Sequence, residues 1–108
     1  MSSSELLKYI PEVSIKNYRK NASCFLILNL DELNEKQFNI NSPHRISYYQ
    51  LTLITEGEGQ IVLDSRKYKY SPRTLIAISK GCIETAVFNE GTGGYTVLFS
   101  EEYINKNP

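Results

Sequence analysis

The sequence lacks several features that would place it in common functional classes. Its 108 residues carry no net charge, because 12 Lys and Arg balance 12 Asp and Glu. A nucleic-acid-binding module usually has a clear basic excess, so this composition argues against direct binding of DNA or RNA. No apolar run approaches the roughly 20 residues that span a bilayer. The N-terminus also lacks a basic stretch followed by an apolar one, so we predict no secretory signal and a cytoplasmic protein with no membrane partner.

Histidine and cysteine are scarce. His44 is the single histidine, and Cys24 and Cys82 are the two cysteines. A transition-metal site normally needs three or four nitrogen, oxygen or sulfur ligands, with imidazole prominent. One histidine therefore argues against a metal-dependent enzyme, and we predict no metal and no other cofactor. With no signal peptide, two free thiols are favoured over a disulfide.

Short apolar segments rich in β-branched and aromatic residues begin at residue 23, and turn residues separate them. Their close spacing predicts one all-β domain, a sandwich or barrel. The predicted strands cover residues 23–30, 45–55, 60–64, 68–71, 74–79, 83–89 and 95–100. Residues 1–22 are predicted to form a partly ordered arm, with a helical turn in "SSELLKYI". A helix is predicted to start in "EEYINKNP", after Ser100.

The segment "HRISYYQLTLIT" is predicted to have two different faces, because side chains alternate along a strand. One face mixes polar and apolar groups, as a ligand cavity does. It carries His44, Ile46, Tyr48, Gln50, Thr52 and Ile54. The other face presents Tyr49, Leu51 and Leu53 in a row. Such a row needs cover, from the 23–30 strand, from the N-terminal segment, or from something outside this sequence such as a partner subunit or downstream helices.

Two short motifs resemble those of the cupins. The spacing His44-x-Ile46-x-x-x-Gln50-x6-Gly57 is similar to the first cupin motif, and "SKGCIE" is similar to the second, with Glu84 at its histidine position. In cupins four positions of these motifs hold a divalent metal inside a small β-barrel. Here one position keeps an imidazole, one is aliphatic, and two carry oxygen-bearing substitutes. The resemblance thus implies a cupin-like jelly roll whose metal site is degenerate.

The ordered series of segments from 44 to 103 resembles the N-terminal sensing domain of AraC-type transcriptional regulators. In that family an aromatic residue and Gln or Glu lead into an apolar strand and then Gly-x-Gly. A hairpin follows that ends in Tyr, and later a strand before the first helix, here Gly94 to Phe99. The usual proline before Gly81 is absent, and the usual Gly-Asp after the hairpin is replaced by Arg73-Thr74.

The resemblance implies a function and a division of the chain. Residues 1–22 would be the arm, 23–103 the effector-binding domain and 104–108 a truncated tail. The domain would bind a small polar effector, possibly a sugar, and form a homodimer. DNA would be bound only through a C-terminal helix-turn-helix domain that this sequence does not contain. We therefore expect an isolated domain of a longer regulator, with no catalytic residues.

The predicted ligand-binding residues are those that should face the interior: His44, Tyr48, Gln50, Glu84, Phe88 and Tyr95. Aromatic rings beside an amide, a carboxylate and an imidazole suit a sugar. A purely structural role is the alternative for these residues: the aromatic side chains would fill the core, and His44 would form hydrogen bonds with its neighbours in a loop. Glu84 must either contact Arg, His or ligand, or face water on an offset strand, because burying an unpaired charge is costly. Ala86, Val97 and Phe99 are expected to face inward as well.

Two other functions are also compatible with the sequence. One is a small metal-dependent cupin enzyme, an isomerase or dioxygenase, that uses His44 and Glu84 with Gln50 or Cys82 nearby. The other is a carbohydrate-binding or purely structural jelly roll. Fold alone does not decide among these alternatives.

Overall fold

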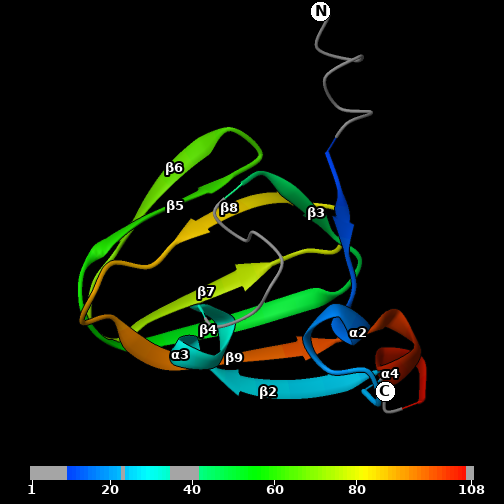
Figure 1. Cartoon of the computed structure of the whole chain (residues 1–108). Coiled ribbons are helices and arrows are strands. Elements are labelled where there is room, and N and C mark those ends of the chain that lie inside the picture. The colour runs from blue at the N-terminus through cyan, green and yellow to red at the C-terminus, as the bar shows by residue number, and fades with distance from the viewer. Residues whose placement is uncertain (1–9, 23, 35–41, 107–108) are drawn as a thin grey trace, which may run out of the picture.

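The structure is a computed structural model that describes residues 10–22, 24–34 and 42–106. Within these ranges it has nine strands in two sheets and three short helices (Figure 1). The five-stranded sheet has the order β1 (Glu12–Val13), β3 (His44–Ile46), β8 (Ile83–Val87), β5 (Gly59–Leu63), β6 (Arg66–Tyr70). The four-stranded sheet has the order β2 (Phe25–Asn29), β9 (Gly93–Phe99), β4 (Tyr49–Glu56), β7 (Thr74–Ile78). The helices are α2 (Ile15–Tyr18), α3 (Leu30–Asn34) and α4 (Glu101–Lys106).

The two sheets enclose one core, as expected of a jelly roll. Every pairing between the strands is antiparallel except that of β1 with β3. The core takes apolar side chains from both sheets and from the arm. Its buried members are Val13, Ile15, Tyr18, Leu28, Leu30, Ile46, Tyr48, Ile54, Ile61, Tyr70, Ile78 and Leu98. In Figure 1 the five-stranded sheet forms the upper layer and the four-stranded sheet the lower one.

The predicted all-β fold is confirmed, and most predicted strands lie where the pattern puts them. The long strand is divided into β3 and β4 at Ser47 and Tyr48, where the chain passes from one sheet to the other. Strand β6 starts at Arg66, two residues earlier than predicted. The reason is a two-residue turn in which Asp64 and Ser65 both have positive φ, the backbone that a tight hairpin needs.

The arm is more regular than predicted. From residue 10 on it forms β1 beside β3 and then helix α2, neither of which was expected. Ser14 is the N-cap residue of α2, and its backbone N–H donates a hydrogen bond to the Asn17 side-chain oxygen at 2.7 Å. The predicted turn in "SSELLKYI" lies almost wholly outside the described residues. The predicted C-terminal helix is confirmed as α4.

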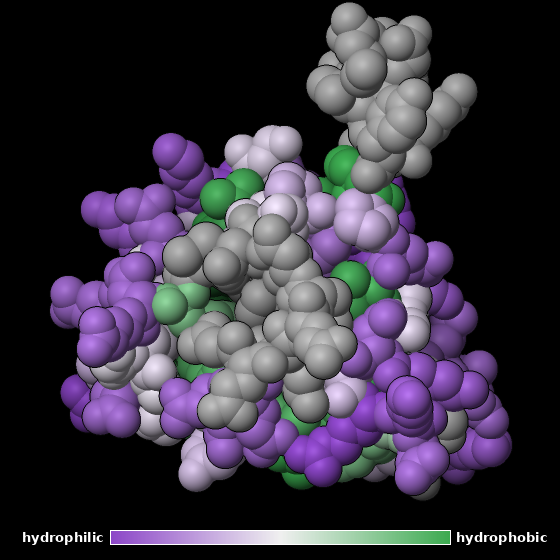
Figure 2. Space-filling model, viewed as in Figure 1, coloured by the Kyte–Doolittle hydropathy of each residue, from purple (hydrophilic) through white to green (hydrophobic). Residues whose placement is uncertain are grey.

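The helices in the described ranges are all too short to cross a membrane. In the view of Figure 2 the surface is mainly hydrophilic, and hydrophobic residues show as small separate areas.

The outer face of the four-stranded sheet is strongly apolar. Cross-strand pairing places Phe25, Phe99 and Tyr49 in one row of this face. The next two rows contain Ile27, Val97, Leu51 and Ala77, and then Asn29, Tyr95, Leu53 and Leu75. Six of these side chains are between 37% and 64% exposed: Phe25, Ile27, Leu51, Leu53, Leu75 and Tyr95. The predicted apolar row 49/51/53 is therefore real, and β2 extends it sideways rather than covering it.

Gly94 lies tightly against β4, opposite Ile54. Its φ is +153°, and a Cβ there would collide with the backbone carbonyl of Leu53. Gly91 also has positive φ, +86°, but a Cβ there would meet open space. We expect Gly94→Ala to lower the free energy of unfolding by about 3 kcal/mol or more, against about 1 kcal/mol for Gly91→Ala.

Urea denaturation of both variants tests this expectation, with Gly91→Ala as the control for backbone strain alone. Equal losses in the two variants would show that the contact with Leu53 is not what requires glycine.

Candidate functional site

The inner face of β3 and β4 carries an unbroken row of buried side chains. His44, Ile46, Tyr48, Gln50, Thr52 and Ile54 are all at most 4% exposed. The predicted inward face of this segment is confirmed, although the segment forms two strands, β3 and β4, that belong to different sheets. Four of the six are polar, so the barrel interior contains a polar strip rather than a purely apolar core.

His44 and Glu84 lie side by side at the start of this row. They are directly paired in the register of β3 and β8, and His44 Nε2 is 3.7 Å from Glu84 Oε2. Both are buried, with 2% and 4% of their surfaces exposed. The interpretation in which Glu84 faces water is therefore wrong, and the one in which it contacts histidine is confirmed.

The neighbours of His44 shift its pKa. His44 Nδ1 lies 3.0 Å from the Ser42 carbonyl oxygen, which can only accept, so Nδ1 carries a hydrogen. In the neutral ring, Nε2 would then present a lone pair to a carboxylate. Burial alone lowers the His44 pKa, but the proximity of Glu84 and the hydrogen bond to Ser42 together outweigh burial and raise the pKa above its ordinary value. The pair therefore favours the protonated form of His44 more than water does.

Gln50 belongs to a second buried polar group, in the four-stranded sheet. Its Nε2 donates to Thr52 Oγ1 at 2.9 Å. The Thr52 and Thr96 hydroxyls are 2.8 Å apart. Thr96 also donates to the Leu51 carbonyl, at 3.4 Å. Each of the two threonine hydroxyls can thus accept one hydrogen bond and donate one, without solvent.

Tyr48 links the barrel to the arm. Its hydroxyl is 3.1 Å from the hydroxyl of Tyr18 in α2, and the two rings meet edge to face with centroids 6.2 Å apart. Burial is the main reason that the pKa of each phenol is raised well above its ordinary value, and the charge of Glu84 raises both further. The His44–Glu84 pair and the two tyrosines therefore form one buried cluster.

The cupin metal positions do not suit a metal in this chain. Ile46 offers no donor atom, and the Gln50 amide is a neutral group already bonded to Thr52. His44 and Glu84 remain, which is fewer than the three protein ligands of a typical catalytic site. No group of three or more His, Cys, Asp or Glu side chains is placed for a metal within the described ranges.

Of the two other predicted ligand-binding residues, Phe88 packs against the core and Tyr95 lies on the outer face. Phe88 is half-buried and packs on the core beside Tyr70, with ring centroids 5.8 Å apart. Tyr95 is 56% exposed on the outer face, opposite Leu53. Its predicted interior position is wrong, and so is that of Val97 and Phe99, because Thr96 and Leu98 are the residues of β9 that point inward. The side chain of Ala86 lies outside the described part of the chain.

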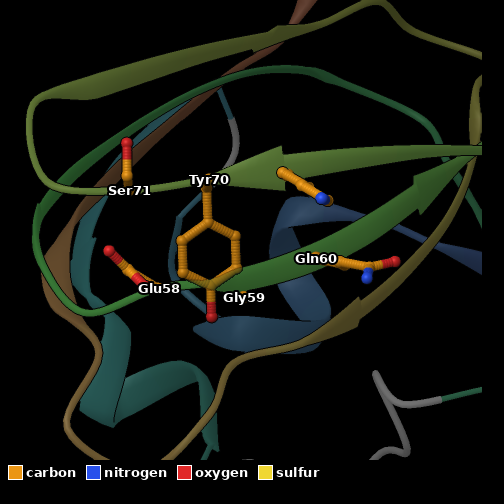
Figure 3. Close-up of a pocket in the computed structure, with 6 residues that line it drawn as sticks. Glu58, Gly59, Gln60, Tyr70 and Ser71 are labelled. Carbon is orange, nitrogen blue, oxygen red and sulfur yellow. The ribbon is translucent and has the colours of Figure 1, made fainter.

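Two surface hollows lie near the sheet edges. One, of about 510 Å³, opens beside β5 and β6 and includes Glu58, Gly59 and Tyr70. Figure 3 shows the Tyr70 ring projecting from β6 towards Gly59. The Tyr70 hydroxyl is 3.0 Å from Thr92 Oγ1 and accepts from the Asn89 backbone N–H. The second hollow, of about 480 Å³, lies between β6 and β7. Neither is lined by His44, Gln50 or Glu84.

Three members of the inner clusters were not predicted from the sequence to line the site. Tyr18 is in a four-residue helix, too short to produce a helical pattern. Thr96 lies on the face of β9 that the sequence pattern predicts to point outward, but in the structure this face points inward. Thr52 was placed on the inner face, but its link between Gln50 and Thr96 depends on a pairing that brings together residues 44 positions apart.

Comparison with known proteins bears on the fold. No family model matches the chain, and no curated protein matches it. A solved structure of plu4264 from Photorhabdus luminescens aligns over 79% of this chain and 82% of its own, with a TM-score of 0.52 and 16% identity. The chain thus shares the all-β fold of that structure, here built from two packed sheets.

Two further solved structures align with lower TM-scores. The Schizosaccharomyces pombe Cnp3 cupin domain aligns with a TM-score of 0.48 and 12% identity, over 60% of this chain and 48% of its own. The chain therefore spans about half the length of that structure. The Clostridium difficile EutQ protein aligns with a TM-score of 0.48 and 19% identity, over 75% and 72% of the two chains. At these identities the likeness concerns the fold alone.

The His44–Glu84 pair predicts a pH dependence of stability. The pKa of His44 is raised in the folded protein, so the folded state binds this proton more tightly than the unfolded state. The resulting stabilisation is complete below the unfolded pKa of about 6.5 and is lost as pH rises through the folded pKa. We expect the urea midpoint to fall as pH rises across neutrality, and His44→Gln to remove this decline.

His44 is the single histidine, so no other imidazole contributes in this range. A wild-type midpoint that rises with pH, or a decline that persists in His44→Gln, would contradict the assignment.

Proposed function

We propose that this chain is the ligand-sensing and dimerisation domain of an AraC-type transcriptional regulator. In this proposal a small polar effector binds in a metal-free barrel and controls a helix-turn-helix domain that the sequence does not contain. The domain acts in the cytoplasm, has no catalytic role and reaches DNA only through that second domain. The order of the motifs from 44 to 103 supports this assignment, together with a fold that suits it.

The observation that carries the proposal is the buried polar strip. The barrel keeps polar groups at 44, 50 and 84, although they cannot complete a metal site. A buried histidine–carboxylate pair costs desolvation, and well-packed apolar residues are often as stabilising or more so. A polar interior without a metal is expected where a ligand's hydroxyl groups can exchange with these hydrogen bonds. His44, Glu84 and Gln50 would bind the effector, with the Tyr48 ring against its apolar face.

The contact of Tyr48 with Tyr18 suggests how binding is communicated. An effector that displaces Tyr48 also changes its hydrogen bond to α2, which belongs to the arm. The Glu84 charge affects both phenols, so a change at the pair reaches the arm as well. The effector would favour one arrangement of the arm by its difference in affinity for the two arrangements.

The outer face of the four-stranded sheet supports the dimer. Taking roughly 200 Å² for a fully exposed large side chain, its six exposed hydrophobic residues leave on the order of 600 Å² uncovered. That is at the upper end of what a monomer exposes and near what one partner contributes to a standard interface. A second copy of the chain is the proposed partner.

A metal-dependent enzyme that uses His44 and Glu84 is the second candidate. The 3.7 Å pair is the observation that favours it, because both groups can bind a metal. The isoleucine at 46 and the engaged amide of Gln50 weigh against it. A purely structural jelly roll would explain the outer face but not the polar strip.

Native mass spectrometry with metal analysis of the same purified sample tests the proposal. We expect a dimer with no stoichiometric metal, either holding a small polar molecule or binding one from a panel of neutral sugars. One tightly held transition metal per chain would overturn the metal-free pocket in favour of the enzyme. A metal-free monomer that binds no sugar would contradict the proposal and favour the purely structural jelly roll.

The dimer can be tested by substitution at the centre of the outer face. Leu53→Asp buries a charge without a partner in the proposed interface, which costs about 3 kcal/mol or more, roughly a hundredfold in the dissociation constant. Lys67→Asp is the matched control, on an exposed position of β6 in the other sheet.

Analytical ultracentrifugation should find Leu53→Asp monomeric and Lys67→Asp dimeric, with circular dichroism showing that both are folded. A Leu53→Asp variant that is as dimeric as the wild type would place the interface elsewhere.

A further inference from the structure

The hollow between β6 and β7 lies at the free edges of both sheets. Strand β6 ends the five-stranded sheet and β7 ends the four-stranded sheet, so this side of the barrel is not closed by strand pairing. The hollow has a volume of about 480 Å³. Its inner wall is buried or half-buried and includes Leu63, Ile78 and Cys82, and the Tyr68 ring stands at its edge, 46% exposed. It is therefore an open hollow whose lining combines apolar side chains, an aromatic ring and polar groups.

Arg66 contributes a positive charge to the lining of this hollow. It lies opposite Leu63 in the β5–β6 register, and side chains of directly opposite residues share a face of the sheet. Among the residues that the structure describes, no carboxylate is within ion-pair distance of Arg66 and no hydrogen bond engages its side chain. A guanidinium offers five donors in a planar fork that suits a carboxylate.

Asp64 is the other charged group of the hollow. One of its carboxylate oxygens accepts the Ile83 backbone N–H at 2.9 Å, so it is partly engaged within the protein. Burial, and then the charge of Asp64, raise the pKa of the Cys82 thiol to about 11. The Cys82 thiol is thus uncharged at physiological pH, and of the two charged groups in the hollow Asp64 repels an anion whereas Arg66 attracts one.

We propose that this hollow binds an amphipathic carboxylate, with the carboxylate on Arg66 and the apolar body against Tyr68, Leu63 and Ile78. The site is separate from the polar strip, and its ligand differs from the neutral polar effector proposed there. The two sites are therefore tested independently, since the present one does not require the regulatory role.

Cys82 provides the readout, because it lines the hollow and its alkylation should slow when the hollow is filled. The test uses a Cys24→Ser background, so that Cys82 is the single thiol. Alkylation by N-ethylmaleimide at mildly alkaline pH is followed by mass spectrometry. The probes are phenylacetate, its neutral isostere phenylacetamide and the cation phenethylamine.

We expect phenylacetate to protect Cys82 in a saturable manner and the two other probes to protect far less. Arg66→Gln should weaken the protection about tenfold or more, the cost of losing a charge-assisted hydrogen bond. Lys67→Gln is the matched control, since it removes the same charge from the neighbouring residue, outside the hollow.

Three results would overturn the proposal. If no probe slows alkylation, the hollow is not a binding site. If phenethylamine protects as well as phenylacetate, Asp64 rather than Arg66 selects the ligand. If Arg66→Gln and Lys67→Gln behave alike, the charge of Arg66 is not the determinant. None of these results affects the expected metal content or dimer of the domain.

Discussion

The inner row from His44 to Ile54 is the constraint on which the rest of the structure depends. Its six alternate residues are buried although the chain changes sheet in their midst. The two ends of the row therefore fix the relative positions of the sheets. His44 sets the register with β8 and Gln50 sets it with β7 and β9. A shift by one residue would turn the whole row outward, so this alternation specifies the barrel.

Much of the fold follows from patterns that the sequence displays. The alternation over residues 44–54 is regular because one side is uniformly covered, and the turns are marked by Gly, Pro, Asn and Asp. The predicted buried face of strand β9 is wrong for a physical reason. Its outward residues, Tyr95, Val97 and Phe99, include two aromatic rings and form an apolar row, whereas one of the two inward residues, Thr96, is polar. Hydrophobicity alone identifies the buried side incorrectly when the exposed side is itself apolar.

The candidate site was only partly predictable. His44, Gln50 and Glu84 could be found because short motifs contain them. The partners that satisfy them could not, since Tyr18 and Thr96 reach the interior only through tertiary packing. Arg66 and Tyr68 look like ordinary surface residues of a charged strand in the sequence. Their significance depends on the free edges of two sheets lying on the same hollow, which local pattern does not encode.

Strand β6 has a consequence for how copies of the molecule can associate. Its sequence "RKYKY" places three cations along the free edge of the five-stranded sheet, and the opposite edge is the two-residue β1. Charge and short length both discourage the addition of a strand from another chain. Growth of the five-stranded sheet into an open-ended polymer is therefore disfavoured. Contact through the apolar face is self-limiting by comparison, because a two-fold pair uses the same surface on both copies and leaves none for a third.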